Sequence, residues 1–183
     1  MDDHQLIAST LSGDHTAFDQ LVLRYQDRLF ASLVHVLGCT ADAQDIAQDA
    51  FVQAFRKLSS FRGQSAFYSW LYRIALNVAA SQRRRKRVTT SLDAQRERMG
   101  DEPVDRGGQP EQELERDEEV RLVRQALSEL AEDHRTILVL REFDGHEYEQ
   151  IAEILDVAVG TVRSRLHRAR LQLKERLEHL MQR

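Results

Sequence analysis

Arginine, serine and histidine side chains recur on one side of a helical pattern near the end of the chain. Counted at about 100° per residue, Arg163, Ser164, His167 and Arg168 fall opposite an apolar stripe. Guanidinium, hydroxyl and imidazole groups are donors with which proteins bind phosphates and base edges in a DNA groove. The same pattern also fits a solvated amphipathic helix at the end of a bundle, so the neighbouring residues must decide between the two.

The segment before these donors supplies the other parts of a helix-turn-helix. Residues 148–155 place apolar side chains on one helical face, and Asp156 is a residue type that tolerates the left-handed backbone of a sharp turn. Thr161 has the side chain of a good N-cap for a second helix. The buried stripe of that second helix is predicted to be Val162, Leu166, Ala169, Leu173 and Leu177. This arrangement favours a second helix that enters a DNA groove.

A second cluster, in the first half of the chain, combines aromatic and basic residues. Ten of the twelve Phe, Tyr and Trp residues lie in the first 72 positions, and five of them fall within residues 61–72. A basic run follows at residues 82–87. Rings that stack on unpaired bases, beside cations that hold phosphates, are typical of single-stranded nucleic-acid binding. The alternative interpretation is an aromatic core followed by a solvated basic helix end.

The elements that must position these clusters are predicted to be helices in two small domains. Residues 1–87 contain three amphipathic helical patterns, and neither half shows strand-like alternation. Residues 88–112 hold both prolines and three of the eight glycines among many charges, which is typical of a flexible linker. We therefore expect an all-α protein with helical domains at 1–87 and 113–183 on a flexible acidic tether. The helices expected in the second domain span residues 115–130, 134–143, 148–155 and 161–181.

Composition and charge narrow the possible functions. The net charge of −4 is uneven, with +3 over residues 1–87, −7 over 88–119 and 0 over 120–183. Local positive patches decide DNA binding, because salt screens distant charges. The single cysteine, Cys39, fits a reducing compartment, and no signal-peptide core or long apolar run is present, so a cytoplasmic location is expected. No metal-ligand spacing, phosphate-binding glycine loop or nucleophile beside a base indicates an enzyme.

A protein that holds duplex DNA with one domain and unpaired bases with the other is best explained by transcription initiation. Two segments strengthen this interpretation, FRGQSAFYSWLYRIALN and GTVRSRLHRAR. In this order and at this separation they resemble the sigma-70 superfamily of sigma factors, and the chain is similar to the extracytoplasmic-function group, above all its sigma-E-like members. Residues from about Phe18 to Arg87 resemble the second sigma region, and residues from about Glu113 onward resemble the fourth.

The resemblance implies roles for three surfaces. Asp45, Gln48 and Asp49, which share one helix face, resemble the motif that docks on the β′ clamp helices of core RNA polymerase. The residues implied for the promoter −10 element are Phe61, Phe67, Tyr68, Trp70, Tyr72, Arg73, Asn77, Arg83, Arg84, Arg85 and Lys86. The residues implied for the −35 element are Thr161, Arg163, Ser164, His167 and Arg168.

The resemblance also implies partners and a class of activity. The partners are core RNA polymerase, through its β′ clamp helices and β flap, promoter DNA, and an anti-sigma factor, which in this family is often membrane-anchored. The protein would be a non-enzymatic promoter-specificity subunit without a cofactor. The alternative that the residues leave open is a stand-alone helix-turn-helix regulator, which gives the aromatic cluster no role. Two positions depart from sigma-E-type relatives: His167, where Phe is common, and Ala158, where Pro is common.

Overall fold

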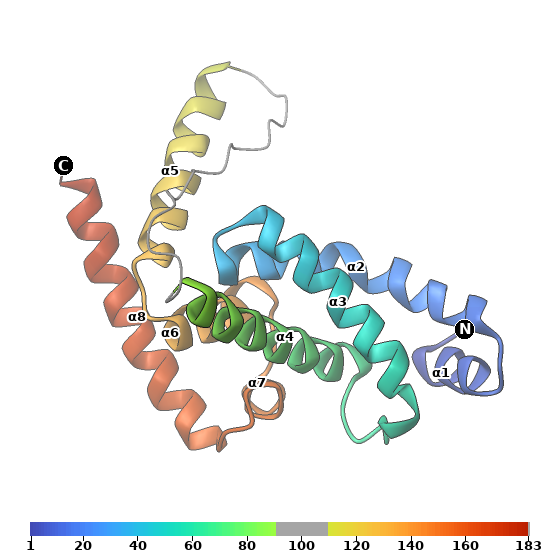
Figure 1. The fold of residues 1–183 in the computed structure, drawn as a ribbon. Helices are drawn as coiled ribbons and strands as arrows, with labels where there is room; N and C mark the ends of the chain where they lie inside the picture. The colour runs from blue at the N-terminus through green and yellow to red at the C-terminus, as the bar shows by residue number, and fades with distance from the viewer. Residues whose placement is uncertain (91–109, 183) are drawn as a thin grey trace.

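The protein is built from helices throughout the part of the chain that the structure describes. The structure, a computed structural model, describes the backbone of residues 1–90 and 110–182 and the side chains of residues 1–85 and 118–182. Every regular element in these ranges is helical, which confirms the predicted all-α class (Figure 1). The elements are α1 (Asp3–Leu11), α2 (His15–Leu37), α3 (Thr40–Lys57), η1 (Leu58–Ser60), α4 (Phe67–Thr90), α5 (Pro110–Ser128), α6 (Glu132–Leu138), η2 (Val139–Phe143), α7 (Tyr148–Leu155) and α8 (Val159–Met181).

The N-terminal helices form a bundle in which α2 packs against α1 and α3, and α3 packs against α4. Their boundaries follow from local capping. The side chain of Asp2 accepts a hydrogen bond from the N–H of Gln5 at the start of α1, and Asp14 does the same for Thr16 at the start of α2. Helix α2 ends at Leu37 and is capped by Gly38, whose φ of 71° is the left-handed conformation that glycine adopts without strain.

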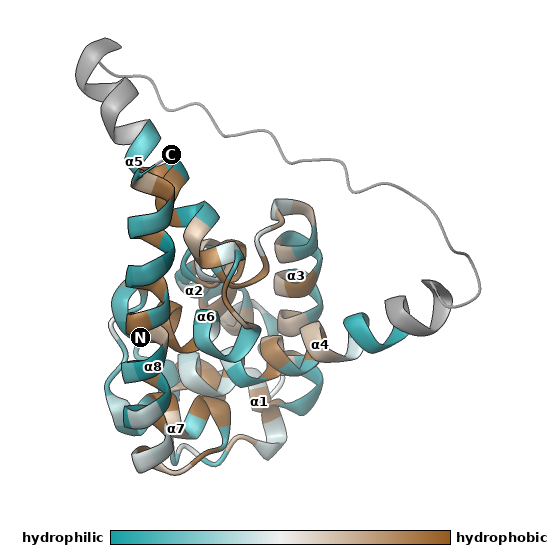
Figure 2. Ribbon diagram, turned by 90° about the vertical axis from the view of Figure 1, so that its left-hand side faces the viewer, coloured by the Kyte–Doolittle hydropathy of each residue, from teal (hydrophilic) through white to brown (hydrophobic). Residues whose placement is uncertain are grey.

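The C-terminal helices pack around α8, which contacts α5, α6 and α7. Figure 2 shows hydrophobic and hydrophilic residues recurring along α8, as expected for a helix with one buried stripe. The single helix predicted over 134–143 is two elements, because α6 ends at Leu138 and η2 continues as a π-helical turn. In that turn the N–H of Asp144 bonds to the carbonyl of Val139, five residues earlier.

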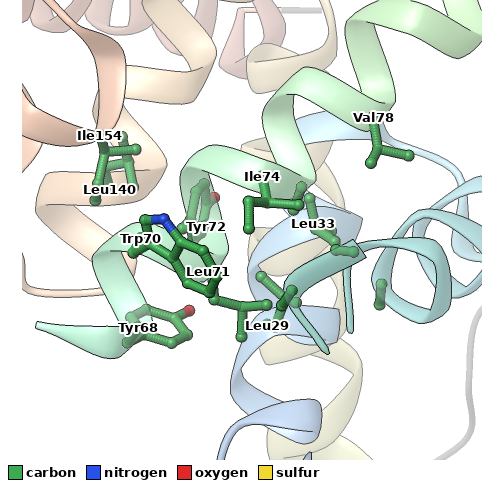
Figure 3. Close-up of a cluster of buried hydrophobic side chains, with 14 of the residues drawn as sticks. Leu29, Leu33, Tyr68, Trp70, Leu71, Tyr72, Ile74, Val78, Leu140 and Ile154 are labelled. Atoms are coloured by element: carbon green, nitrogen blue, oxygen red, sulfur yellow. The ribbon is translucent and has the colours of Figure 1, made fainter. Parts of the chain in front are cut away.

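The two bundles pack against each other. Helix α4 contacts α7, and α2 contacts α6 and η2, so one hydrophobic core runs through both bundles. In Figure 3, Leu140 and Ile154 of the C-terminal bundle belong to the same buried cluster as Trp70 and Tyr72 of α4. Helix α4 continues to Thr90 and α5 begins at Pro110, so both extend into the predicted tether; residues 91–109 lie outside the described part of the chain.

Within the residues described, the helices lack the combination of length and apolar character that crossing a bilayer requires.

Candidate nucleic-acid interface

Helices α7 and α8 form the helix-turn-helix that the sequence predicts. Asp156 between them has φ 54° and ψ 51°, which confirms the left-handed turn expected at this residue. Helix α7 begins at Tyr148, as predicted, and the side chain of Gln150 accepts a hydrogen bond from the N–H of Glu147 at its start (3.0 Å). In the turn itself, the N–H of Val157 bonds to the carbonyl of Ala152 (3.0 Å), so a local hydrogen bond holds the chain where α7 ends.

The start of α8 differs from the prediction. Thr161 was expected to cap the helix, but Ala158 has the extended N-cap backbone and the helix begins at Val159. Thr161 therefore lies in the first turn, where its N–H bonds to the carbonyl of Ala158 (2.8 Å). Its own carbonyl accepts a hydrogen bond from the Ser164 hydroxyl (3.1 Å). The helix thus starts two residues earlier than the sequence interpretation placed it.

The polar face of α8 is exposed, as its spacing predicts. Val162, Leu166 and Ala169 are buried against the bundle. The opposite side presents Arg163, Ser164, His167 and Arg168, all exposed, with Thr161 half-buried at its edge. The face therefore offers guanidinium, hydroxyl and imidazole groups in one patch on the second helix of a helix-turn-helix, which is the arrangement that enters a major groove.

Neighbouring arginines on α8 are engaged within the bundle. Arg170 makes two hydrogen bonds to a carboxylate oxygen of Glu142 (2.9 and 2.6 Å), and this pairing raises the pKa of its guanidinium. Arg165 lies 3.7 Å from Asp133. In contrast, Arg163 and Arg168 form no ion pair with any residue in the described part of the chain. These two guanidinium groups are therefore available to a ligand.

A basic stripe lies along the exposed side of α4. Arg73, Asn77 and Arg84 are all exposed and fall within about 40° of one another around the helix. Arg85 is also exposed, while Arg83 is half-buried and forms an ion pair with Glu132 at the start of α6. The side chain of Lys86 lies outside the described residues. The stripe is suited to following a phosphate backbone.

The aromatic residues beside this stripe are mostly buried. Phe67, Tyr68, Trp70 and Tyr72 are at most 9% exposed, and Phe61 is half-buried. These rings are therefore packed in the core in this structure, and their role at unpaired bases stays a prediction. Phe67 and Trp70 pack against Phe61, with ring centroids 5.9 and 5.2 Å away. Tyr68 and Tyr72 instead meet a ring from the second bundle, that of His146.

The polar face predicted on α3 is exposed. Asp45, Gln48 and Asp49 point to solvent along one side of the helix, and Asp49 accepts a hydrogen bond from the side chain of Gln82 on α4 (3.3 Å). This bond links the face on α3 to the basic helix.

A groove beside Gln48 was missed by the sequence analysis. It has a volume of about 1140 Å³ and runs between α2 and α3, and its apolar lining includes Phe18, Val22, Phe51 and Phe55. The sequence signal for this groove was the pair of apolar residues Val52 and Phe55. In the structure they lie on α3 and are 45% and 40% exposed.

Together, these observations define a class: an all-helical protein in which a helix-turn-helix with an exposed donor face packs against a bundle with a basic helix. Comparison with known proteins is specific about the family. Residues 21–89 match Sigma-70 region 2, and residues 121–173 match Sigma-70, region 4. The chain belongs to the sigma-70 family and is an RNA polymerase sigma factor of the extracytoplasmic-function type, a non-enzymatic transcription initiation factor.

Curated relatives match along almost the whole chain. The RNA polymerase sigma-H factor of Pseudomonas aeruginosa is 42% identical over 98% of this chain and 95% of its own length. The ECF RNA polymerase sigma-E factor of Escherichia coli K12 is 40% identical over 99% of this chain and 97% of its own length. Because both sigma regions are present, the stand-alone regulator is not favoured.

Two solved structures share the fold. The sigma factor RpoE of Bartonella quintana, solved with the anti-sigma factor NepR, has a TM-score of 0.70 and 30% identity over 88% of this chain and 96% of its own. CnrH, solved with the cytosolic domain of CnrY, has a TM-score of 0.70 and 29% identity over 97% of both chains.

Proposed function

We propose that this sigma factor, bound to core RNA polymerase, places α8 in the duplex at the promoter −35 element while α4 holds unpaired bases at the −10 element. The observation that carries the proposal is the exposed donor face of α8. Arg163 and Arg168 are solvent-exposed on the second helix of a helix-turn-helix and are not engaged by the carboxylates around them. A guanidinium in this position can bind a guanine edge or a phosphate.

The −10 part of the proposal is supported by the stripe on α4. Arg73, Asn77 and Arg84 form a line of exposed donors, and a line of this kind follows a single strand by holding its phosphates. The aromatic rings next to the stripe supply stacking surfaces once they are accessible. Melting costs base stacking and pairing, and capture of the extruded bases offsets part of that cost.

Docking on core polymerase is assigned to two surfaces. Asp45, Gln48 and Asp49 on α3 contact the β′ clamp helices, since their exposed polar groups lie on one face beside an apolar groove. The β flap contacts the second bundle, where a shallow groove of about 400 Å³ between α6 and α8 is lined by apolar groups, including Leu138, Leu173 and Leu177. Core polymerase is a cytoplasmic enzyme, so we place the protein in the cytoplasm.

An anti-sigma factor is the third partner. RpoE, which shares this fold, was solved with the anti-sigma factor NepR, and CnrH was solved with the cytosolic domain of CnrY. We expect this chain to be held by a protein of the same kind, membrane-anchored if its binding segment is also a cytosolic domain.

Transcription in vitro tests the proposal. Core RNA polymerase, with and without the purified chain, is given a library of duplex templates in which the −35 and −10 positions are randomised. The chain is expected to produce run-off transcripts from a subset of templates that share one motif at each position. Transcripts that are no more promoter-specific than those of core polymerase alone would refute the proposal.

A further inference from the structure

A loop of the second bundle lies directly on the aromatic face of the first. This cover loop consists of residues Asp144, Gly145 and His146, between η2 and α7. A carboxylate oxygen of Asp144 accepts a hydrogen bond from Ser32 of α2 (2.6 Å), and its backbone carbonyl accepts one from Arg28 (2.8 Å). The loop therefore docks on α2 through side-chain and main-chain contacts.

The cover loop has a shape that its own bundle fixes. The N–H groups of Asp144 and His146 bond to the carbonyls of Val139 and Leu140 (3.0 and 2.9 Å). Arg141 donates to the carbonyl of His146 (2.8 Å), and Gly145 turns the chain at φ 70°. Because all these contacts are internal to the second bundle, the loop keeps its shape when the bundles separate, and it docks as a rigid body.

The groups that the loop places on α4 have the chemistry of a nucleotide. The imidazole of His146 stacks on the ring of Tyr68, with 5.5 Å between centroids and 13° between planes, as a base would. The carboxylate of Asp144 supplies an anion beside Arg28, whose guanidinium lies 4.2 Å from the centroid of the Tyr68 ring. A flat ring and an anion therefore occupy one face, on which Tyr68 is only 4% exposed.

This packing leaves polar groups unsatisfied. The hydroxyl of Tyr68 and Nε2 of His146 are buried without a hydrogen-bond partner among the described residues. Buried donors and acceptors without partners cost free energy. A ligand that satisfies the Tyr68 hydroxyl, as a base edge can, would compete with the loop for this face.

We infer that the cover loop is an intramolecular inhibitor: in the free chain Asp144 and His146 occupy the face that Tyr68 and Arg28 offer to an unpaired base, and separation of the two bundles uncovers it. The inference rests on the proposed role of α4 at the −10 element. It assigns Arg28, on α2, to the same single-strand face, although the sequence patterns did not point to it. The contacts are all within one chain, so the inhibition requires no other protein.

A reversible lock tests the inference. Ser32→Cys and Asp144→Cys are combined in the full chain with Cys39→Ser, and the matched control is Ser32→Cys with Cys39→Ser alone. The probe is a fluorescent single-stranded DNA of randomised sequence, about 12 nucleotides long. The oxidised lock is expected to bind the probe at least about tenfold more weakly than the same protein after reduction, while the control is unchanged by oxidation. A pair that does not cross-link, or equal affinity in both states, contradicts the inference.

An opening variant gives a second, independent readout. Asp144→Lys places a cation beside Arg28 and removes the acceptor for Ser32, and Glu118→Lys on the exposed side of α5 is its charge-matched control. Only Asp144→Lys should increase the radius of gyration and strengthen probe binding beyond the control. If Asp144→Lys expands the chain but does not strengthen probe binding, the inhibition is refuted. The proposed function still stands in that case, provided that the natural chain drives promoter-specific transcription. If that transcription also fails, the proposed function itself is wrong.

Discussion

The hydroxyl oxygen of Ser32 lies 2.6 Å from a carboxylate oxygen of Asp144, although 112 positions separate the two residues in the sequence. Ser32 also lies 2.6 Å from the hydroxyl of Tyr72. Serine has one hydrogen to donate, so when it donates to an ionised Asp144 it must accept from Tyr72. The result is a buried donor chain from α4 through α2 to the cover loop, and it joins the two bundles at one point.

The first prediction concerns the ionisation of Asp144. Burial raises the pKa of this carboxyl to about 6, above its ordinary value of 3.8, so packing favours the protonated form relative to the unfolded chain, although the group is still mostly ionised near pH 7. The contribution of Asp144 to the free energy of unfolding is therefore fully present below about pH 4 and is lost as the pH rises through 6. Asp144→Asn stays neutral and still accepts from Ser32, so it should be more stable than the natural chain at about pH 8 by at most about 3 kcal/mol. Urea denaturation measures this difference.

Comparing the natural chain with Asp144→Asn across pH separates the effect of Asp144 from that of the titratable groups around it. The charged and titratable groups that face it are Arg28, Tyr68, Tyr72 and His146. Burial lowers the pKa of His146, which opposes packing at low pH, but it does so in both proteins. The advantage of Asp144→Asn should shrink between about pH 8 and pH 5. A difference that is constant across this range would show that Asp144 does not titrate at the interface.

The second prediction concerns the hydroxyl of Tyr72. This side chain is fully buried, and burial raises the pKa of its phenol well above the ordinary value, so it acts only as a neutral donor. Tyr72→Phe keeps the ring and removes the hydrogen bond to Ser32, which should reduce the free energy of unfolding by about 1–2 kcal/mol. Chemical denaturation measures the change. Tyr25→Phe is the control, because its hydrogen bond to Asp3 is only partly buried and its loss should cost less.

The sequence was sufficient to predict the elements that carry local signals. The helix-turn-helix was recognisable because Asp156 tolerates the left-handed turn and because Val162, Leu166 and Ala169 repeat at helical spacing. The start of α8 was misplaced because a threonine was available as a cap, whereas extended backbone at Ala158 begins the helix without a side-chain hydrogen bond. The local residue pattern was therefore enough to predict the helix-turn-helix, whereas the first residue of α8 depended on backbone geometry.

The packing of the two bundles was not predictable in the same way. Spacing identified Tyr68 and Tyr72 as part of an aromatic cluster but could not show that a loop more than 70 positions later covers them. Neither Asp144 nor His146 belongs to a local pattern that indicates a contact with α4. The alternative interpretation of the aromatic cluster, an ordinary core, was correct for Phe67 and Tyr72.

The third prediction concerns recognition by α8. Arg163→Ala and Arg168→Ala should each weaken binding to the −35 element by about 1–3 kcal/mol if the arginine binds a base edge. A phosphate contact instead predicts a smaller, sequence-independent loss, with the salt slope reduced by about one. Electrophoretic mobility shifts of the polymerase complex at several salt concentrations separate the two cases. Arg121→Ala, an exposed arginine of α5 paired with Glu118, removes the same charge and should leave −35 preference unchanged.

The last prediction concerns docking on polymerase. Asp45→Ala and Gln48→Ala remove exposed polar groups from α3 that contact little of their own bundle, so each should fold normally and weaken binding to core polymerase about tenfold, or about 1.4 kcal/mol. Glu118→Ala on α5 also removes an exposed side chain and should bind core polymerase like the natural chain. Fluorescence titration of labelled chain with core enzyme measures the affinity. If the α3 variants bind as tightly as Glu118→Ala, the docking face lies elsewhere, and the groove between α2 and α3 becomes the next surface to substitute.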